Sequence, residues 1–201
     1  GGLNKVKPPA ERNDINGVKQ GGYMEIRQNL HLEMRQAMDV WEEIDDDFQQ
    51  RFGRGGTPIL DPYRCEDAEF IIVAMGSMAN QFQDVVDRLR ESDGLKAGVL
   101  ALQMYRPFPT ARIAEALQAA KVIMVCEKGL SYGNQGALFA DLKSALYPYQ
   151  ARPRLHNYIV GLGGREIRTD DLYLEMKQAC RQDDQATPEQ NDTPQWIGMQ
   201  L

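Results

Sequence analysis

The chain has 201 residues, 42% of them hydrophobic and 26% charged, a composition typical of a soluble globular protein. Its formal net charge of -6 argues against electrostatic binding to nucleic acid or to an anionic membrane. No apolar run approaches the roughly 20 residues that span a bilayer. The N-terminus does not show the charged segment followed by an apolar one that is typical of a secretion signal. We therefore expect a cytoplasmic protein with no nucleic-acid partner and no membrane partner.

The N-terminal quarter of the chain predicts a linker followed by one long helix. Residues 1–22 begin with glycine instead of methionine and show no periodicity, so we interpret them as a linker or a cloning remnant attached to a piece of a longer protein. Residues 23–64 predict a long helix and a hinge. The apolar side chains that recur at helical spacing are Leu30, Met34, Met38, Trp41, Ile44, Phe48 and Phe52. The opposite face is acidic and is either solvated or a partner site; it carries Glu42, Glu43, Asp45, Asp46 and Asp47.

The remainder of the chain repeats an apolar run, a turn and a helix-period segment four times. Near-continuous apolar runs of this length are typical of strands that are buried on both faces of a parallel sheet. The runs occupy 69–75, 98–105, 122–127 and 155–160. We predict an α/β fold over 65–180, with three layers, a mostly parallel sheet flanked by helices and right-handed crossovers on both faces. Residues 181–201 predict a polar tail whose apolar end, 196–201, docks on the domain or on a neighbour.

The loop after the third run is the most informative segment for function. It contains three glycines within 127–136, together with polar side chains that can hydrogen-bond to a neighbouring surface. We predict that Lys128, Tyr132, Asn134 and Gln135 contact another domain or subunit. The alternative is a glycine-rich turn that only leads into the next helix.

Arg106 begins an Arg-Pro-Phe-Pro sequence, 106–109, at the expected carboxyl edge of the sheet. Two prolines stop the strand there because they cannot donate to the ladder. Arg106 is predicted either to contact an anion or another domain, or to satisfy exposed carbonyl groups at the bend.

Two further turns superficially resemble phosphate-binding loops. Residues 75–77 (Met-Gly-Ser) join a strand to a helix, and 161–166 read Gly-Leu-Gly-Gly-Arg-Glu. The first lacks the GxGxxG pattern and the second lacks the following GK[ST], so neither predicts a nucleotide site.

Taken together, the sequences at 75–77, 106–109, 128–139 and 159–166 resemble core domain II of the alpha chain of pyruvate and related 2-oxoacid:ferredoxin oxidoreductases. That domain is similar to the C-terminal domain of transketolase, and the resemblance covers roughly 23–180. It implies a parent enzyme that oxidatively decarboxylates a 2-oxoacid, pyruvate above all, with thiamine diphosphate, Mg²⁺, [4Fe–4S] clusters and coenzyme A. The implied partners are other domains and subunits of that complex and, through it, ferredoxin.

Within that enzyme, the resemblance implies that this chain is a scaffold that is inactive alone. No Gly-Asp-Gly followed by Asn is present to hold Mg²⁺ and a diphosphate, and no cysteine quartet is present to bind a cluster. We therefore assign no catalytic, cofactor-binding or metal-binding residue. Two alternatives remain: the transketolase-like domain of another thiamine enzyme, and a free-standing nucleotide-binding or regulatory module.

The two histidines lack the neighbours that catalysis requires. His31 lies beside the apolar stripe of the predicted helix, and His156 lies inside a predicted strand. Neither has a nucleophile elbow, a carboxylate pair or metal-ligand spacing next to it, so we predict structural roles for both.

Overall fold

The computed structural model describes residues 23–56, 58–150, 153–181 and 193–199. The chain divides into two compact units, Gly1–Gly56 and Thr57–Leu201.

The described part of the first unit is the predicted long helix, α1, which runs from Tyr23 to Phe52. None of its residues is buried within the structure, so its apolar stripe is exposed or half-exposed along the whole helix. At its C-terminal end the rings of Phe48 and Phe52 lie 4.7 Å apart, and Arg54 lies 5.7 Å above the Phe48 ring.

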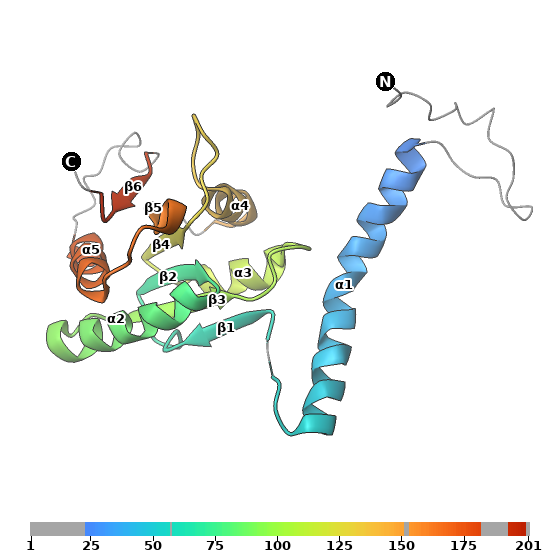
Figure 1. Cartoon of the computed structure of the whole chain (residues 1–201), viewed down its shortest axis with the longest axis horizontal. Coiled ribbons are helices and arrows are strands. Elements are labelled where there is room, and N and C mark those ends of the chain that lie inside the picture. Colours follow the sequence, from blue (N-terminus) through green and yellow to red (C-terminus); the bar gives the residue numbers. More distant parts are fainter. Residues whose placement is uncertain (1–22, 57, 151–152, 182–192, 200–201) are drawn as a thin grey trace, which may run out of the picture. The chain divides into compact units, whose positions relative to one another are not determined.

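The second unit alternates strands and helices, as the four repeats predicted (Figure 1). In chain order its elements are β1 (Leu60–Tyr63), β2 (Phe70–Met75), α2 (Ser77–Asp93), β3 (Ala97–Leu102), α3 (Thr110–Leu117), β4 (Val122–Glu127), α4 (Ala137–Leu146), β5 (Arg154–Val160), the 3-10 turn η2 (Leu162–Gly164), α5 (Thr169–Arg181) and β6 (Gln195–Ile197).

The strands form one sheet in the order β1-β3-β2-β4-β5-β6. The four strands predicted from the apolar runs pair in parallel with one another, which confirms the mostly parallel sheet. The second of them, β3, ends at Leu102 instead of Tyr105. It ends early because the N–H groups of Gln103 and Met104 donate to the carbonyl of Ile59 and leave the parallel ladder.

Two edge strands lie outside the expected range of 65–180. β1 falls in the segment that we interpreted as a hinge, and it pairs antiparallel with β3. It contains Pro62, which an edge strand tolerates because one side of that strand needs no donor. β6 falls in the tail and pairs in parallel with β5, so the described part of the apolar end docks on its own domain.

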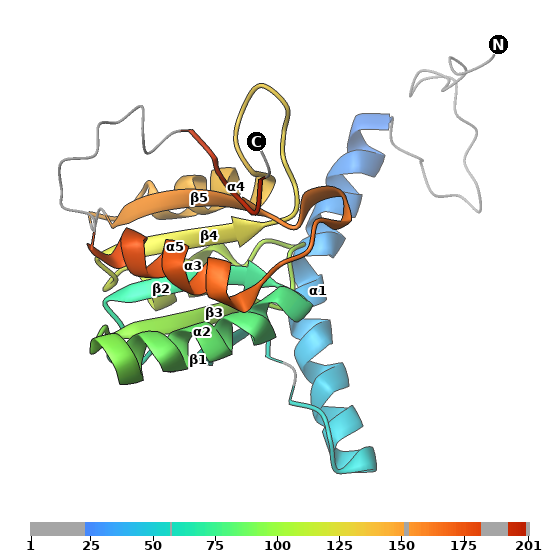
Figure 2. The same ribbon diagram turned by 60° about the vertical axis from the view of Figure 1, so that its left-hand side comes forward.

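Helices cover both faces of the sheet and complete three layers (Figure 2). α2 and α5 pack on one face, around Phe82, Leu172 and Met176. α3 and α4 pack on the other face, around Ile113, Leu138 and Leu142. From β2 to β3 the chain moves toward the β1 edge of the sheet and passes through the first layer. From β3 to β4 and from β4 to β5 it moves toward the β6 edge and passes through the second layer. The three crossovers that join the four predicted strands therefore share one hand, as the rule for parallel strands requires.

Polar contacts join α2 to α5 on the outside of the first layer. The Asp93 carboxylate accepts hydrogen bonds from the Tyr173 hydroxyl at 2.6 Å and from Arg181 at 3.0 Å, and it pairs with Lys177 at 2.6 Å. Asp93 is the last residue of α2, and its partners Tyr173, Lys177 and Arg181 lie one turn apart along α5, so these contacts tie α5 to the C-terminal end of α2.

Replacing Phe82 by Ala tests the first layer. Phe82 is fully buried, so we expect the substitution to lower the free energy of unfolding by about 3 to 5 kcal/mol, the usual cost of a large cavity. Urea titration followed by circular dichroism measures it. Tyr132→Ala removes an aromatic ring that is 87% exposed and serves as the control, with an expected change within about 0.5 kcal/mol. Equal losses in the two variants would contradict this core.

Candidate functional site

The loops that follow the parallel strands all leave from the carboxyl edge of the sheet, where α/β proteins place their binding residues. β2 lies between β3 and β4 in the sheet. The Arg106 loop and the 128–136 loop therefore share an edge but start from strands that are not adjacent. The chain crosses from β3 past β2 to β4, which separates the starting points of the two loops.

The Glu127 carboxylate is the buried anchor of this edge. Glu127 is the last residue of β4, and only 3% of it is exposed. Its two oxygens accept hydrogen bonds from the backbone N–H groups of Leu138 at 2.9 Å and Phe139 at 3.0 Å, in the first turn of α4. A carboxylate in this position satisfies donors that the helix leaves unpaired and interacts favourably with the positive end of its dipole.

Two effects act on the pKa of Glu127 in opposite directions. Burial, the larger effect, raises the pKa because it disfavours the charged form. Hydrogen bonds from Leu138, Phe139 and Asn157 favour the carboxylate and limit the rise. The net direction is upward, so the helix N-terminus compensates the desolvation of this carboxylate only in part.

Asn157 of β5 and Gly136 complete the arrangement around Glu127. The Asn157 side-chain amide donates to the Glu127 carboxylate at 3.2 Å, and its carbonyl oxygen accepts from the Gly136 N–H at 2.8 Å. The backbone of Gly136 is extended and open to any residue. However, a Cβ atom there would overlap the Glu127 carboxylate. Glycine is therefore required at 136 by space and not by backbone conformation.

Sequence reasoning missed the roles of Glu127 and Asn157. One signal was present: an acidic residue closes an otherwise apolar strand just before a glycine-rich loop and a helix. Asn157 gave no such signal, because a single polar residue in a strand does not reveal which buried group it faces.

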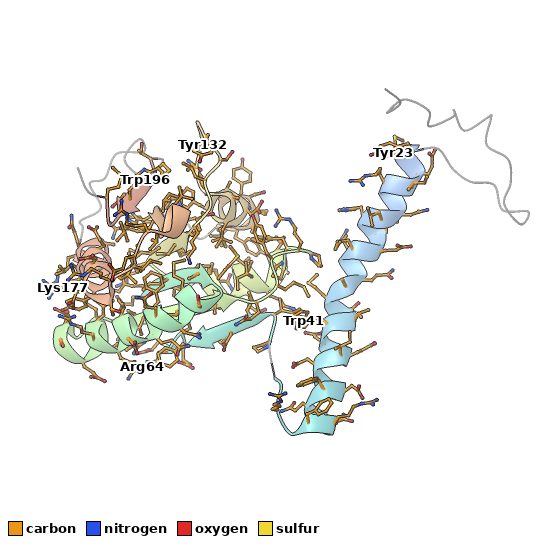
Figure 3. All side chains as sticks on the ribbon, viewed as in Figure 1. Tyr23, Trp41, Arg64, Tyr132, Lys177 and Trp196 are labelled. Atoms are coloured by element: carbon orange, nitrogen blue, oxygen red, sulfur yellow. The ribbon has the colours of Figure 1, made fainter. Side chains whose placement is uncertain are left out.

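The 128–135 loop projects from this anchor (Figure 1). Backbone hydrogen bonds close it internally, from Ser131 N–H to the Gln135 carbonyl at 3.0 Å and from Asn134 N–H to the Ser131 carbonyl at 2.9 Å. Tyr132 is labelled at the tip in Figure 3 and is 87% exposed. Lys128 and Asn134 are also exposed. These three predicted contact residues are placed where another surface can reach them.

Gln135 departs from the prediction. Its side chain is buried instead of being presented outward. The Gln135 side-chain oxygen lies 3.5 Å from the Lys143 ammonium of α4, within the same domain. Gln135 comes just before α4, and its side chain packs on that helix instead of facing outward.

Arg106 contacts groups of its own domain, which favours the prediction that it satisfies exposed carbonyl groups at the bend. Its guanidinium donates to the Tyr105 carbonyl at 2.9 Å and to the Asp141 carboxylate of α4 at 2.7 Å. It also lies 4.0 Å above the Tyr105 ring. The Tyr105 hydroxyl donates to the same Asp141 carboxylate at 2.7 Å, so the β3 loop is tied to α4.

The histidines take no part in the hydrogen bonds around Glu127. His31 is exposed on α1. His156 of β5 is 2% exposed, and its Nε2 atom has no hydrogen-bond partner in the described part of the chain. Burial, followed by the positive charge of Arg154, lowers the pKa of His156, so the imidazole is held neutral. Over the described ranges, no group of three His, Cys, Asp or Glu side chains is placed to hold a metal ion. The helices in these ranges are also too short or too polar to cross a membrane.

Comparison with known proteins assigns the family. Residues 68–172, slightly more than half of the chain, match the family model described as pyruvate:ferredoxin oxidoreductase core domain II. The chain belongs to this family. The match begins just before β2 and ends in α5, so it includes Glu127, Asn157 and the loops of the carboxyl edge.

Curated relatives agree with the family match. The pyruvate synthase subunit PorA of Thermotoga maritima is 39% identical over 150 residues, which cover 75% of this chain and 38% of that protein. The ketoisovalerate oxidoreductase subunit VorA of Pyrococcus abyssi is 35% identical over the same shares. The chain therefore spans less than half the length of these relatives.

Among solved structures, the chain is similar to the alpha chain of a probable 2-oxoacid ferredoxin oxidoreductase from Thermoplasma acidophilum. It is 21% identical with a TM-score of 0.37, covering 61% of this chain and 97% of that chain. So loose a superposition carries no argument about the fold.

Replacing Gly136 by Ala tests the Glu127 anchor. The added Cβ would displace the carboxylate from the α4 N-terminus, so we expect a loss of about 2 to 4 kcal/mol in the free energy of unfolding. Gly129→Ala is the matched control in the same loop, because its Cβ would lie 3.9 Å from the nearest carboxylate oxygen, an ordinary contact. A Gly136→Ala variant as stable as the control would contradict the anchor.

Replacing His156 by Leu tests the effect of acid on stability. Because the pKa of His156 is lowered in the folded state, the unfolded chain binds more protons below about pH 6.5. The stability contributed by the neutral imidazole is full above that pH and falls as the pH drops toward the lower folded value.

We therefore expect the His156→Leu variant to lose less stability than the parent between about pH 7 and pH 5, measured by urea titration at each pH. Glu127 acts in the opposite sense, because its raised pKa makes the folded state bind the extra proton. The comparison is therefore between variant and parent at equal pH. Parallel pH profiles would contradict a role for His156.

Proposed function

We propose that this chain is the scaffold portion of a 2-oxoacid:ferredoxin oxidoreductase that acts on pyruvate. The parent enzyme would decarboxylate the oxoacid oxidatively, transfer the acyl group to coenzyme A and pass the electrons to ferredoxin. The observation that carries the proposal is the family match over 68–172, which takes in the loops that follow β2, β3, β4 and β5. Relatives named pyruvate synthase, at up to 39% identity, support pyruvate as the substrate.

A branched-chain oxoacid is the second candidate substrate. The ketoisovalerate oxidoreductase subunit is 35% identical over the same share of the chain, close to the value for the pyruvate synthase subunit. Neither value separates the two substrates, because residues outside this chain make up most of both relatives.

The scaffold role is supported by the chemistry of the described residues. The Glu127 carboxylate is occupied by the α4 N-terminus and Asn157, and Arg106 is occupied by Asp141. Neither group is available as a proton carrier or as a ligand for a cofactor. Thiamine diphosphate with Mg²⁺, and the [4Fe–4S] clusters, would be held by other parts of the enzyme.

The contact surface that we propose is the exposed part of the 128–135 loop. Its internal hydrogen bonds and the Glu127 anchor hold the backbone in place before any partner arrives, which reduces the entropy lost on association. Tyr132 presents a large rigid ring at the tip, and tyrosine is a frequent anchor of protein interfaces. Lys128 and Asn134 supply polar groups beside it.

Activity of the whole enzyme tests the proposed reaction. The complete complex that contains this chain is purified, and coenzyme A-dependent reduction of ferredoxin is measured with pyruvate and with ketoisovalerate. We expect reduction with pyruvate at the higher kcat/KM. A higher value with ketoisovalerate would select the second candidate. Reduction with neither oxoacid would overturn the proposal.

Replacing Tyr132 by Ala tests the contact surface. We expect assembly of the complex to weaken by about 1 to 3 kcal/mol, the cost of removing an interface anchor. The free energy of unfolding of the chain should change by no more than about 0.5 kcal/mol, since the ring is exposed. Co-purification of the subunits and thermal unfolding of the chain are measured together.

Tyr147→Ala is the matched control, because Tyr147 is also exposed but follows the opposite end of α4. Arg106→Ala is less informative, since it also breaks the contact with Asp141 that holds the fold. Weaker assembly in the Tyr147 variant, with the Tyr132 variant unaffected, would place the interface at the other edge of the sheet.

A further inference from the structure

Two segments that stood out in the sequence meet at the carboxyl ends of β5 and β6. One is the glycine-rich turn 161–166, and the other is the apolar segment that begins at Trp196. Between them lies a pocket of about 310 Å³. Its lining residues are Ile159, Gly161, Leu162, Arg165, Trp196, Ile197, Gly198 and Met199.

The parallel pairing of the two edge strands creates this pocket. β5 and β6 run in register, with Ile159 opposite Trp196 and Val160 opposite Ile197, so both strands release their loops at the same level. The β5 loop then turns sharply at Gly161, whose φ is +68°. A Cβ at Gly161 would lie 2.6 Å from the Ile167 side chain, so only glycine allows this close approach.

Most of the pocket wall is apolar, with one aromatic surface. The Trp196 side chain is 43% exposed and that of Met199 is 57% exposed, although both belong to a segment paired with the sheet or next to it. Trp196 is labelled in Figure 3, on the same side of the domain as Tyr132. An exposed indole at the wall of a pocket offers a planar surface for stacking.

Arg165 supplies the positive charge of the pocket. The Cγ atom of Arg165 lies 3.7 Å from the position that a Cβ at Gly198 would occupy, so its aliphatic stem runs along the turn after β6. Its guanidinium has no hydrogen-bond or ion-pair partner in the described part of the chain. Other arginines of the domain differ in this respect: Arg64 pairs with Asp87, Arg88 with Asp170 and Arg90 with Asp67.

We propose that this pocket binds a small planar anion, with the ring against Trp196 and the anionic group paired with Arg165. Its volume lies at the lower end of the range of about 300 to 1,000 Å³ typical of small-molecule sites. Arginine binds carboxylate and phosphate with paired hydrogen bonds. Leu162 and Met199 cover the remaining ring surface. The site is separate from the 128–135 loop and does not depend on the proposed function.

Tryptophan fluorescence provides the test. The chain has two tryptophans, so Trp41→Phe leaves Trp196 as the single emitter. This variant is titrated with benzoate and with adenosine monophosphate, which represent the aryl carboxylates and the nucleotides. Two compounds serve as controls: adenosine, which lacks the anionic group, and inorganic phosphate, which lacks the ring. Calorimetric titration of the unsubstituted chain measures the Kd of each compound independently.

We expect saturable quenching by at least one of the two anions with a Kd below about 1 mM, and at least tenfold weaker binding of adenosine and phosphate. Binding of benzoate alone would assign an aryl carboxylate, and binding of the nucleotide alone a nucleoside phosphate. No saturation by either anion up to about 10 mM, by fluorescence and calorimetry, would overturn the proposal.

Arg165→Gln, made in the Trp41→Phe background, identifies the anion contact. We expect about tenfold weaker binding, as is usual when a hydrogen bond to a charged group is lost. Arg168→Gln removes another exposed cation of the segment between β5 and α5, one that does not line the pocket, and should leave the Kd unchanged. Thermal unfolding confirms that both variants are folded. Equal Kd values in the two variants would overturn the assignment of Arg165.

Discussion

The buried carboxylate of Glu127 joins three elements of the domain at one point. It ends β4, accepts the first N–H groups of α4 and accepts the Asn157 amide of β5. A buried carboxylate that loses these donors would keep the full cost of desolvation, so the three elements must meet in this one arrangement. The path of the 128–135 loop follows from it, because both ends of the loop are fixed by the same group.

The carboxyl edge combines internally paired charges with exposed aromatic groups. The β3 loop is tied to α4 by hydrogen bonds from Arg106 and Tyr105 to Asp141. Tyr132 and Trp196, by contrast, keep large surfaces exposed at the same edge. A frame of this kind suits the proposed scaffold role, since rigid elements hold recognition groups more precisely than mobile ones.

Family membership extends over only part of the described structure. The match at 68–172 covers the sheet from β2 to β5, the helices α2 to α4 and the first turn of α5, while α1, β1 and β6 lie outside it. α1 buries none of its own apolar stripe. Long amphipathic helices in proteins gain most of their stability from packing of such a stripe, so α1 is the element whose stability depends most on contacts beyond itself.

Much of the architecture was determined by the sequence alone. Continuous apolar runs specify strands that are covered on both faces, and the three-and-four spacing from Leu30 to Phe52 specifies a helix, because both patterns arise from local backbone geometry. The loops at Arg106 and at 128–135 were found for the same reason, since proline and glycine act on the local backbone.

Only the tertiary structure decided which side chains those loops present. Leu60–Tyr63 and Gln195–Ile197 are too short for a periodic signal, and their pairing depends on strands far away in the sequence. Gln135 turned inward and Arg106 paired with Asp141 because α4 lies beside them, and Asn157 reached Glu127 from another strand. Contacts of this kind join residues that are distant in the chain, and a sequence pattern with a period of two or four residues carries no information about them.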